Sequence, residues 1–145
     1  MTTIAFRNGV MASDSACWIG NTLGHRVKKM WRVKGALLGF AGDYTAAQQF
    51  LQWVKNGGHE DEYPNLSKFI LDVMAVHADG KIHLFEGHYS HLPIASTSNY
   101  SAIGSGADFA LGAMHAGASA VEAVRAATAH DKNSRGPIRT LKLIL

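Results

Sequence analysis

The sequence predicts an α+β fold in which two antiparallel sheets pack face to face and helices cover their outer sides. Short apolar runs that meet at tight glycine turns indicate strands, and three segments with apolar residues at helical spacing indicate helices. These elements follow one another as strands, helix, strands, two helices and a final strand, an order typical of layered α+β domains. A chain of 145 residues is long enough for one such domain and too short for two, so we expect residues 1–145 to form a single domain.

Three glycine turns organise the predicted strands. Asn8-Gly9 is a strong signal for a two-residue hairpin turn, and Lys34-Gly35 and Asp79-Gly80 lie between apolar runs in the same way. The strands predicted around these turns are residues 3–6 and 10–13, 27–33 and 36–41, and 69–77 and 81–85. Further strand-like runs are found at residues 100–103 and 137–145.

The first predicted helix covers Tyr44–Lys55. Its apolar residues recur at helical spacing, Asp43 can cap its first turn, and the stretch Asn56-Gly57-Gly58 ends it. The remaining segments are assigned to two more helices, at residues 107–115 and 119–130, and to two loops, at residues 59–65 and 88–99.

Composition and charge limit the classes of protein to which this chain can belong. The chain is 47% hydrophobic and 17% charged with a net charge of +3, which are the values of an ordinary globular protein. A single cysteine, Cys17, excludes an intramolecular disulfide and fits a reducing compartment. No apolar run approaches the roughly 20 residues of a membrane span, and no charged-then-apolar leader precedes the first strand. We therefore expect a soluble, cytoplasmic protein with no membrane partner.

Two kinds of binding are considered and not expected. The basic run at residues 25–32, His-Arg-Val-Lys-Lys-Met-Trp-Arg, favours nucleic-acid binding, but the other Lys and Arg residues are spread over several segments and the net charge is small. His88 and His91 could form a pair of metal ligands, but no cluster of cysteines or carboxylates completes a recognisable metal site. The sequence therefore predicts no nucleic-acid partner and no metal.

Seven short stretches, taken in order, carry a resemblance to a known family. They are Thr-Thr-Ile at 2–4, Ala-Ser-Asp-Ser at 12–15, Gly-Asn-Thr at 20–22, Val-Lys-Lys-Met-Trp-Arg at 27–32, Gly-Phe-Ala-Gly at 39–42, Ile-Gly-Ser-Gly at 103–106 and Asp-Lys-Asn-Ser-Arg-Gly at 131–136. Each alone is a weak signal, since a serine between glycines, for example, fits any tight turn. Together and in this order they resemble the proteasome β-subunits, and in particular the bacterial HslV peptidase.

The resemblance implies an N-terminal-nucleophile (Ntn) hydrolase fold, which is a four-layer α/β/β/α sandwich. It also implies a catalytic threonine: after removal of Met1, the hydroxyl of Thr2 would attack a peptide carbonyl while the α-amine of the same residue takes the proton. A terminal amine has an ordinary pKa of about 8, so it can act as a base close to neutral pH. By resemblance, the chain is a threonine-type endopeptidase that works through an acyl-enzyme on Thr2.

The same resemblance assigns roles to other positions. Lys29 would lower the pKa of the α-amine, and Asp14 would pair with Lys29 on the neighbouring strand and hold it in place. The backbone N–H of Gly42 would stabilise the oxyanion, and Gly39 would leave room for a large apolar side chain in a substrate pocket. Ser105 would form a hydrogen bond near the amine, and Asp131 and Ser134 would lie behind it and orient it.

Partners also follow from the resemblance. The family implies a homo-oligomeric ring, a hexamer or a heptamer that can stack on a second ring, with peptides or unfolded proteins as substrates. It further implies a separate ATP-dependent unfoldase, because this chain has no phosphate-binding loop of its own. No cofactor is expected.

This sequence differs from the family pattern in the first helical layer. The family has a second long helix before the third hairpin, whereas this chain has only residues 56–68, which are largely polar. We therefore expect a shortened helical layer, with that face of the sheet covered by other means such as a neighbouring subunit. Ser13 and Ser15 also stand where HslV proteins typically have glycine. The main alternative function is a non-catalytic ring or scaffold subunit of the same fold.

Overall fold

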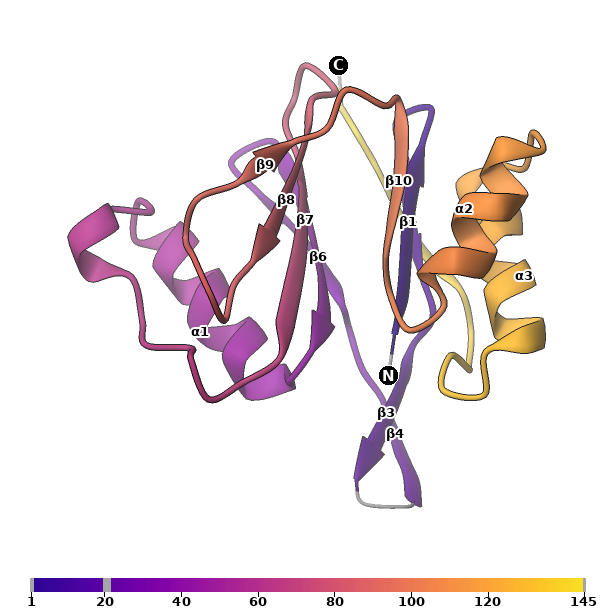
Figure 1. The fold of residues 1–145 in the computed structure, drawn as a ribbon, viewed down its shortest axis with the longest axis horizontal. Helices are drawn as coiled ribbons and strands as arrows, with labels where there is room; N and C mark the ends of the chain where they lie inside the picture. The colour runs from indigo at the N-terminus through magenta and orange to yellow at the C-terminus, as the bar shows by residue number, and fades with distance from the viewer. Residues whose placement is uncertain (1, 20–21, 145) are drawn as a thin grey trace.

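The computed structural model describes residues 2–19 and 22–144 and contains two main antiparallel sheets between helices (Figure 1). One sheet has the strand order β10 (Tyr100–Gly104), β1 (Thr3–Arg7), β2 (Val10–Ser13), β11 (Arg139–Lys142). The other has the order β5 (Met30–Val33), β6 (Ala36–Gly42), β7 (Leu71–Val76), β8 (Ile82–Glu86), β9 (Ile94–Ala95). The outer layers are α1 (Tyr44–Lys55) on the five-stranded sheet, and α2 (Ala107–His115) and α3 (Ala120–His130) on the four-stranded one. The predicted α/β/β/α sandwich is confirmed.

Side chains cap the first turns of α1 and α3. Helix α1 has the predicted bounds, and Oδ1 of Asp43 accepts a hydrogen bond from the N–H of Ala46 at 3.0 Å. Helix α3 begins after Ser119, whose hydroxyl and backbone N–H form a capping box with Glu122. In the described part of the chain, no helix is both long enough and apolar enough to cross a membrane.

The strand predicted at residues 27–33 begins only at Met30. The N–H of Val27 donates to the carbonyl oxygen of Ser15, just before β3, at 2.8 Å, and the bond of this segment to β6 is the one from the N–H of Phe40 to the carbonyl oxygen of Lys29 at 3.0 Å. As a result Lys29 lies just before its strand, with its side chain directed inward, while Lys28 is exposed.

Strands β3 (Ala16–Ile19) and β4 (Thr22–Arg26) form a hairpin that the sequence analysis missed. Strand-favouring residues flank a Gly-Asn dipeptide there, which is itself a turn signal. The pairing shifts register between Cys17 and Trp18, and the hairpin extends beyond one end of the two sheets (Figure 1). Gly20 and Asn21 of the family-like Gly-Asn-Thr stretch lie outside the described residues, as does Met1.

The first helical layer is shortened as expected, but the chain itself covers part of the face beside α1. In the described segment between α1 and β7, the regular structure is one 3₁₀ turn, η1 (Glu60–Glu62), within a predicted loop. Leu66 is buried in the core beneath α1, and Tyr63 and Phe69 pack against it. Residues of the chain itself therefore cover this part of the sheet in place of a second long helix.

Apolar side chains form one core between the sheets and one beneath each helical layer. Strand alternation separates them: Ile4 and Phe6 of β1 face the other sheet, whereas Ala5 faces α2 and α3. The core beneath α2 and α3 is rich in alanine, which lets these helices lie close to β1 and β2.

Phe50 should be the largest single contributor to the core beneath α1. It is fully buried and makes edge-to-face contacts with the rings of Phe40, Trp53, Tyr63 and Phe85. Phe50→Ala should lower the free energy of unfolding by about 3–5 kcal/mol, because it removes a buried ring and leaves a cavity. Tyr89→Ala, at a site that is 79% exposed, should change it by less than about 1 kcal/mol. If urea denaturation showed the same decrease in the free energy of unfolding for Phe50→Ala and Tyr89→Ala, this packing would be contradicted.

Candidate active site

The start of the chain is held in the interior of a sheet. Strand β1 pairs with β2 on one side and β10 on the other, and Thr2 and Thr3 are only 5% and 0% exposed. A Cβ at Gly104 would lie 2.0 Å from the carbonyl oxygen of Thr2, and one at Gly106 would lie 2.0 Å from Oγ1 of Thr3. Glycine is therefore favoured at both positions, because a Cβ there would displace Thr2 or the side chain of Thr3.

Asp14 and Lys29 form a buried ion pair. Nζ of Lys29 lies 3.0 Å from Oδ1 and 3.1 Å from Oδ2 of Asp14, and the two residues are 6% and 0% exposed. The carboxylate also accepts hydrogen bonds from the backbone N–H groups of Thr3 and Arg135, each at 3.0 Å. The predicted pairing is present, although the two residues lie at strand ends and not within strands.

Burial lowers the pKa of the Lys29 ammonium from its ordinary value, and the charge and hydrogen bonds of Asp14 oppose that decrease. Lys29 lines the same cleft as Thr2. A cation in this position disfavours a second positive charge nearby, so it stabilises the neutral form of an adjacent amine.

Ser105, Asp131 and Ser134 form a second polar cluster. The hydroxyls of Ser105 and Ser134 each donate to Oδ2 of Asp131 at 2.6 Å, and the N–H of Asn133 donates to Oδ1 at 3.2 Å. Burial by itself raises the pKa of the Asp131 carboxyl, these three hydrogen bonds lower it, and the resulting pKa lies below its ordinary value. The Ser105 hydroxyl also lies 3.4 Å from the carbonyl oxygen of Thr2.

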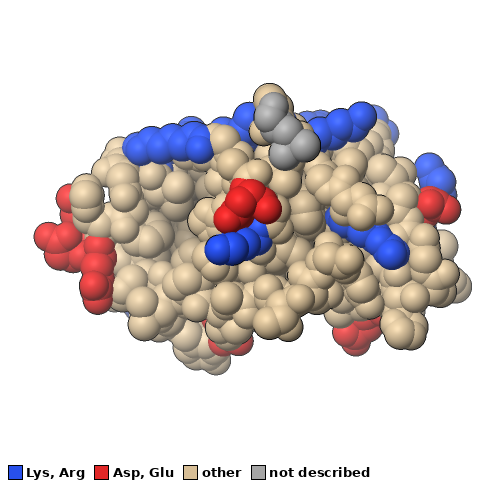
Figure 2. All heavy atoms as spheres, turned by 90° about the horizontal axis from the view of Figure 1, so that it is seen from above, with Lys and Arg blue, Asp and Glu red and all other residues tan. Residues whose placement is uncertain are grey.

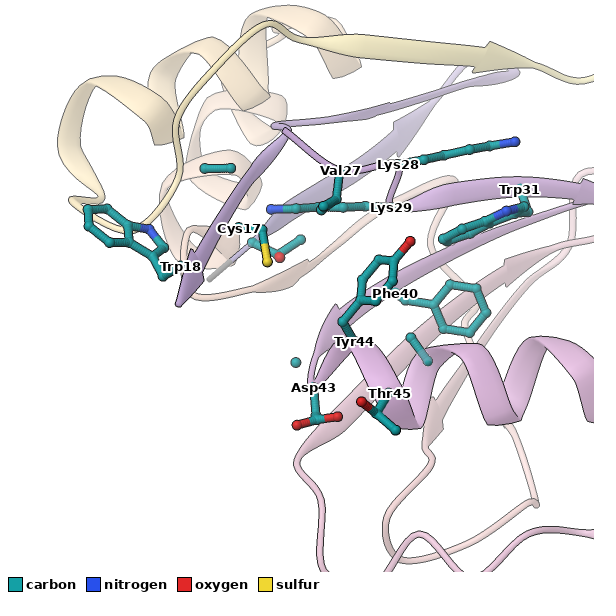
Figure 3. A pocket seen from close by; sticks show the side chains of 14 residues that line it. Cys17, Trp18, Val27, Lys28, Lys29, Trp31, Phe40, Asp43, Tyr44 and Thr45 are labelled. Atoms are coloured by element: carbon teal, nitrogen blue, oxygen red, sulfur yellow. The ribbon is translucent and has the colours of Figure 1, made fainter. Parts of the chain in front are cut away.

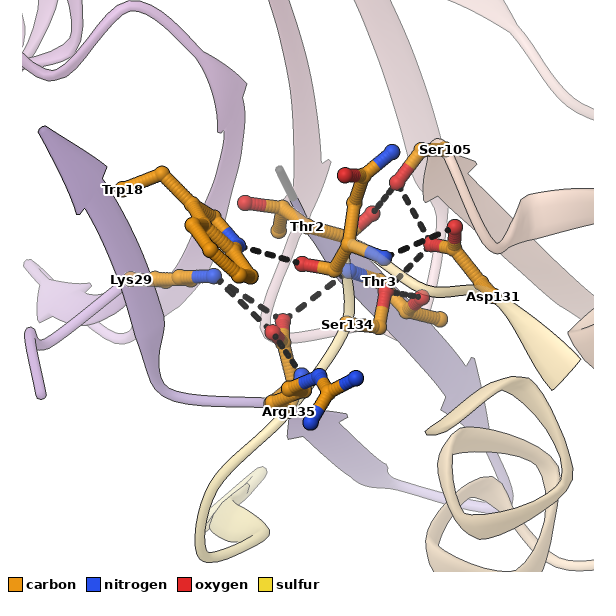
Figure 4. Close-up of polar contacts among 10 residues, drawn as sticks. Thr2, Thr3, Trp18, Lys29, Ser105, Asp131, Ser134 and Arg135 are labelled. Carbon is orange, nitrogen blue, oxygen red and sulfur yellow. Dashed lines mark hydrogen bonds and ion pairs between the residues drawn. The ribbon is translucent and has the colours of Figure 1, made fainter. Parts of the chain in front are cut away.

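A cleft of about 320 Å³ opens beside Thr2. Figure 4 shows Thr2 between Lys29 on one side and the Ser105–Asp131 pair on the other. Figure 3 shows the walls, in which Cys17 and Lys29 face Tyr44 across the opening. Aromatic side chains also line the cleft: Trp18, Trp31, Phe40 and Tyr44.

Gly42 also lines the cleft, at the junction of β6 and α1. It has a φ of 123°, and a Cβ there would lie 2.2 Å from the carbonyl oxygen of Ile70. Glycine is therefore required by both the backbone conformation and the neighbouring chain, and its backbone borders the cleft that Thr2 lines.

Gly39 does not line this cleft. A Cβ at Gly39 would lie 2.7 Å from Cγ2 of Ile4 and 3.1 Å from Sδ of Met11, so its small size serves the packing between the sheets. Because side chains alternate along β6, the next residue, Phe40, faces the cleft. The expectation that Gly39 makes room in a substrate pocket is therefore corrected.

The basic run at residues 25–32 is divided by burial, because Lys29 is enclosed with Asp14. Exposed cations, among them Arg32 and Lys142, lie on the edge strands β5 and β11, which run side by side. Figure 2 shows Lys and Arg side chains along one edge of the face that it displays. Positive charge on edge strands hinders their pairing with other sheets, which accounts for this pattern without a bound nucleic acid.

Several contributions to the site are not predicted from the sequence. Thr3 bonds to both polar clusters, the N–H of Arg135 holds Asp14, and the indole N–H of Trp18 lies 3.4 Å from the carbonyl oxygen of Asn133. Backbone donors and acceptors leave no residue-type signal in a sequence, and the only hint for Thr3 was its place beside Thr2.

Comparison with solved structures identifies the fold. HslV from Trypanosoma brucei matches with a TM-score of 0.70 over 97% of this chain and 98% of that chain, at 19% identity. The chain has the HslV-like, proteasome β-subunit fold. Two structures of BPH from Thiobacillus denitrificans, one in complex with epoxomicin, match at 22% identity with TM-scores of 0.66 and 0.65, over 99% of this chain and 99% and 98% of those chains. Likeness at these identities establishes the HslV-like fold alone. No family model and no curated protein matches the sequence.

Asp131 should make the stability of this HslV-like fold depend on pH. Its folded-state pKa is depressed below an unfolded value of about 3.9, so its stabilising effect is complete above that value and is lost as the pH falls through the folded-state pKa. Wild type should therefore exceed Asp131→Asn in the free energy of unfolding at about pH 6, and the difference should shrink towards about pH 2. Urea denaturation of both proteins at several pH values measures this. A difference that grows on acidification would contradict the assignment.

Proposed function

We propose that this chain is the threonine-type peptidase subunit of a self-compartmentalising ring and cleaves peptide bonds through an ester on Thr2. The observation that carries the proposal is the convergence of Thr2, the buried Lys29–Asp14 ion pair and Gly42 at one cleft. The Ser105–Asp131 pair beside Thr2 and the HslV-like fold agree with it.

The directions of the hydrogen bonds support a role for the α-amine as the base. Ser105 donates its only proton to the carboxylate of Asp131, so the lone pairs of its oxygen can accept a hydrogen bond. Once Met1 has been removed, we propose that the amine of Thr2 donates to Ser105 and keeps its own lone pair for the hydroxyl proton. Lys29 favours the neutral amine that this requires.

In the proposed acylation, the amine takes the proton of the Thr2 hydroxyl as Oγ1 bonds to the substrate carbonyl carbon. The backbone N–H of Gly42 donates to the resulting oxyanion. The carbon–nitrogen bond then breaks, and the ammonium group returns its proton to the departing amine. In deacylation, water attacks the ester with the amine again as base, the bond from the carbonyl carbon to Oγ1 breaks, and Thr2 regains its proton. These steps use no cofactor.

The proposal extends to assembly and partners. A homo-oligomeric ring, hexameric or heptameric and open to stacking, would enclose the cleft of each subunit. The substrates would be peptides or unfolded proteins in the cytoplasm, delivered by a separate ATP-dependent unfoldase. The resemblance in motifs and the HslV-like fold support this extension.

The nucleophile can be tested with epoxomicin, which is present in one BPH structure. Intact mass spectrometry of protein freed of Met1 should show one adduct on wild type, and none on Thr2→Ala, which lacks the hydroxyl. Thr2→Ser keeps a hydroxyl and an α-amine, so it should still form the adduct. Lys29→Met should slow its formation because the amine is then more fully protonated at neutral pH.

The control is the fold and assembly of each variant, measured by circular dichroism and by size-exclusion chromatography with light scattering. Adduct formation on Thr2→Ala would show that a residue other than Thr2 is the nucleophile. A wild type that lacks Met1, is folded and forms no adduct would sink the peptidase proposal and favour the scaffold alternative.

The walls of the cleft favour a large apolar side chain before the scissile bond. Phe40 and Trp31 meet edge to face at 5.5 Å, and Tyr44 adds a third ring. Lys28 lies at the cleft with Nζ 5.5 Å from the centre of the Trp31 ring, which disfavours a basic substrate side chain. Fluorogenic peptides with leucine or phenylalanine at this position should have a kcat/KM about tenfold or more above those with lysine or arginine. Equal values would contradict this specificity.

A further inference from the structure

Thr3 is the residue at which the two polar clusters of the site meet. Its backbone N–H donates to Oδ1 of Asp14 at 3.0 Å, and its Oγ1 lies 2.6 Å from Oγ of Ser134. Thr3 is fully buried, and the missing Cβ of Gly106 leaves the space that its hydroxyl occupies. The residue therefore touches both the Lys29–Asp14 pair and the Asp131 cluster while being covalently bonded to Thr2.

The direction of the Thr3 hydrogen bond follows from counting protons. A carboxylate can only accept, so Ser134 uses its single hydroxyl proton towards Oδ2 of Asp131. The proton between Oγ1 of Thr3 and Oγ of Ser134 must then come from Thr3. The result is a chain of donors that runs from Thr3 through Ser134 to the Asp131 carboxylate.

Such a chain strengthens each of its members, because a hydroxyl that accepts a hydrogen bond becomes a better donor. Asp131 also receives the hydroxyl of Ser105, which lies beside Thr2. The Thr3 hydroxyl can therefore reduce the effective negative charge that Asp131 presents to the α-amine of Thr2. A less negative neighbour lowers the pKa of an amine.

We infer that Thr3 is a positioning residue for the reaction: its N–H and hydroxyl fix Thr2 between the two clusters and tune the α-amine through Ser134 and Asp131. This inference rests on the proposed function. It assigns no contact with substrate to Thr3, which is enclosed in the protein.

Thr3→Ala and Thr3→Ser form a matched pair for the test. Both remove the methyl group, so any effect of lost packing is shared, and they differ only in the hydroxyl. In protein freed of Met1, Thr3→Ala should lower kcat for a fluorogenic peptide by about tenfold with little change in KM. The acid limb of its pH–rate profile should move to higher pH, because the amine next to a more negative Asp131 is harder to deprotonate. Thr3→Ser should recover both properties towards wild type.

A second measurement separates failure of this inference from failure of the proposed function. The pKa of the Thr2 α-amine can be followed by NMR through a carbon-13 label in Thr2, with no turnover required. A higher pKa of the Thr2 amine in Thr3→Ala than in Thr3→Ser supports the inference, even if wild type forms no epoxomicin adduct. The missing adduct would contradict only the peptidase proposal. Equal pKa values in the two variants, or equal kcat values where turnover is present, would overturn the role of Thr3.

Discussion

The rest of the site depends on the ion pair and hydrogen bonds that the carboxylate of Asp14 forms. This carboxylate joins three separate segments: Thr3 at the start of β1, Lys29 before β5, and Arg135 in the loop after α3. A buried carboxylate is tolerated only when its lone pairs are filled, and here the ammonium and two backbone N–H groups fill them. Each of these donors therefore fixes the position of its own segment relative to Thr2.

The loop at residues 131–136 serves both halves of the site. Its Asp131 and Ser134 side chains bind Ser105 and Thr3, while the backbone of Arg135 bonds to Asp14 and to the N–H groups of Ser15 and Ala16. Gly136, with a φ of 87°, turns the chain where a Cβ would lie 2.6 Å from Oγ of Ser15. A loop of polar residues is thus held in one conformation by Ser105 and by segments more than 100 residues away in sequence, and this fixes the cluster beside Thr2.

Sequence patterning succeeded where a local physical signal decides the structure. Asn8-Gly9 turns one hairpin because both residues adopt positive φ, and α1 begins at Tyr44 because the Asp43 carboxylate accepts an otherwise unpaired N–H. It failed at the hairpin of β3 and β4, because Gly20-Asn21 was considered only as part of a family motif and not as a turn signal. It also failed at Gly39. For Gly39, only the side of β6 on which the residue lies distinguishes a pocket from the packing between the sheets.

By itself, the sequence determined the layered α+β class, the helices and the residue types of the candidate site, because caps, turns, periodicity and motif order are local properties of the chain. Tertiary structure alone decided that Lys29 is buried against Asp14, that Phe40 and not Gly39 faces the cleft, and that Thr3 links the two clusters. These are contacts between segments that only the packed sheets bring together. They depend on the register of β1 with β10 and on which face of each strand is enclosed, and neither can be read from residue types along one segment.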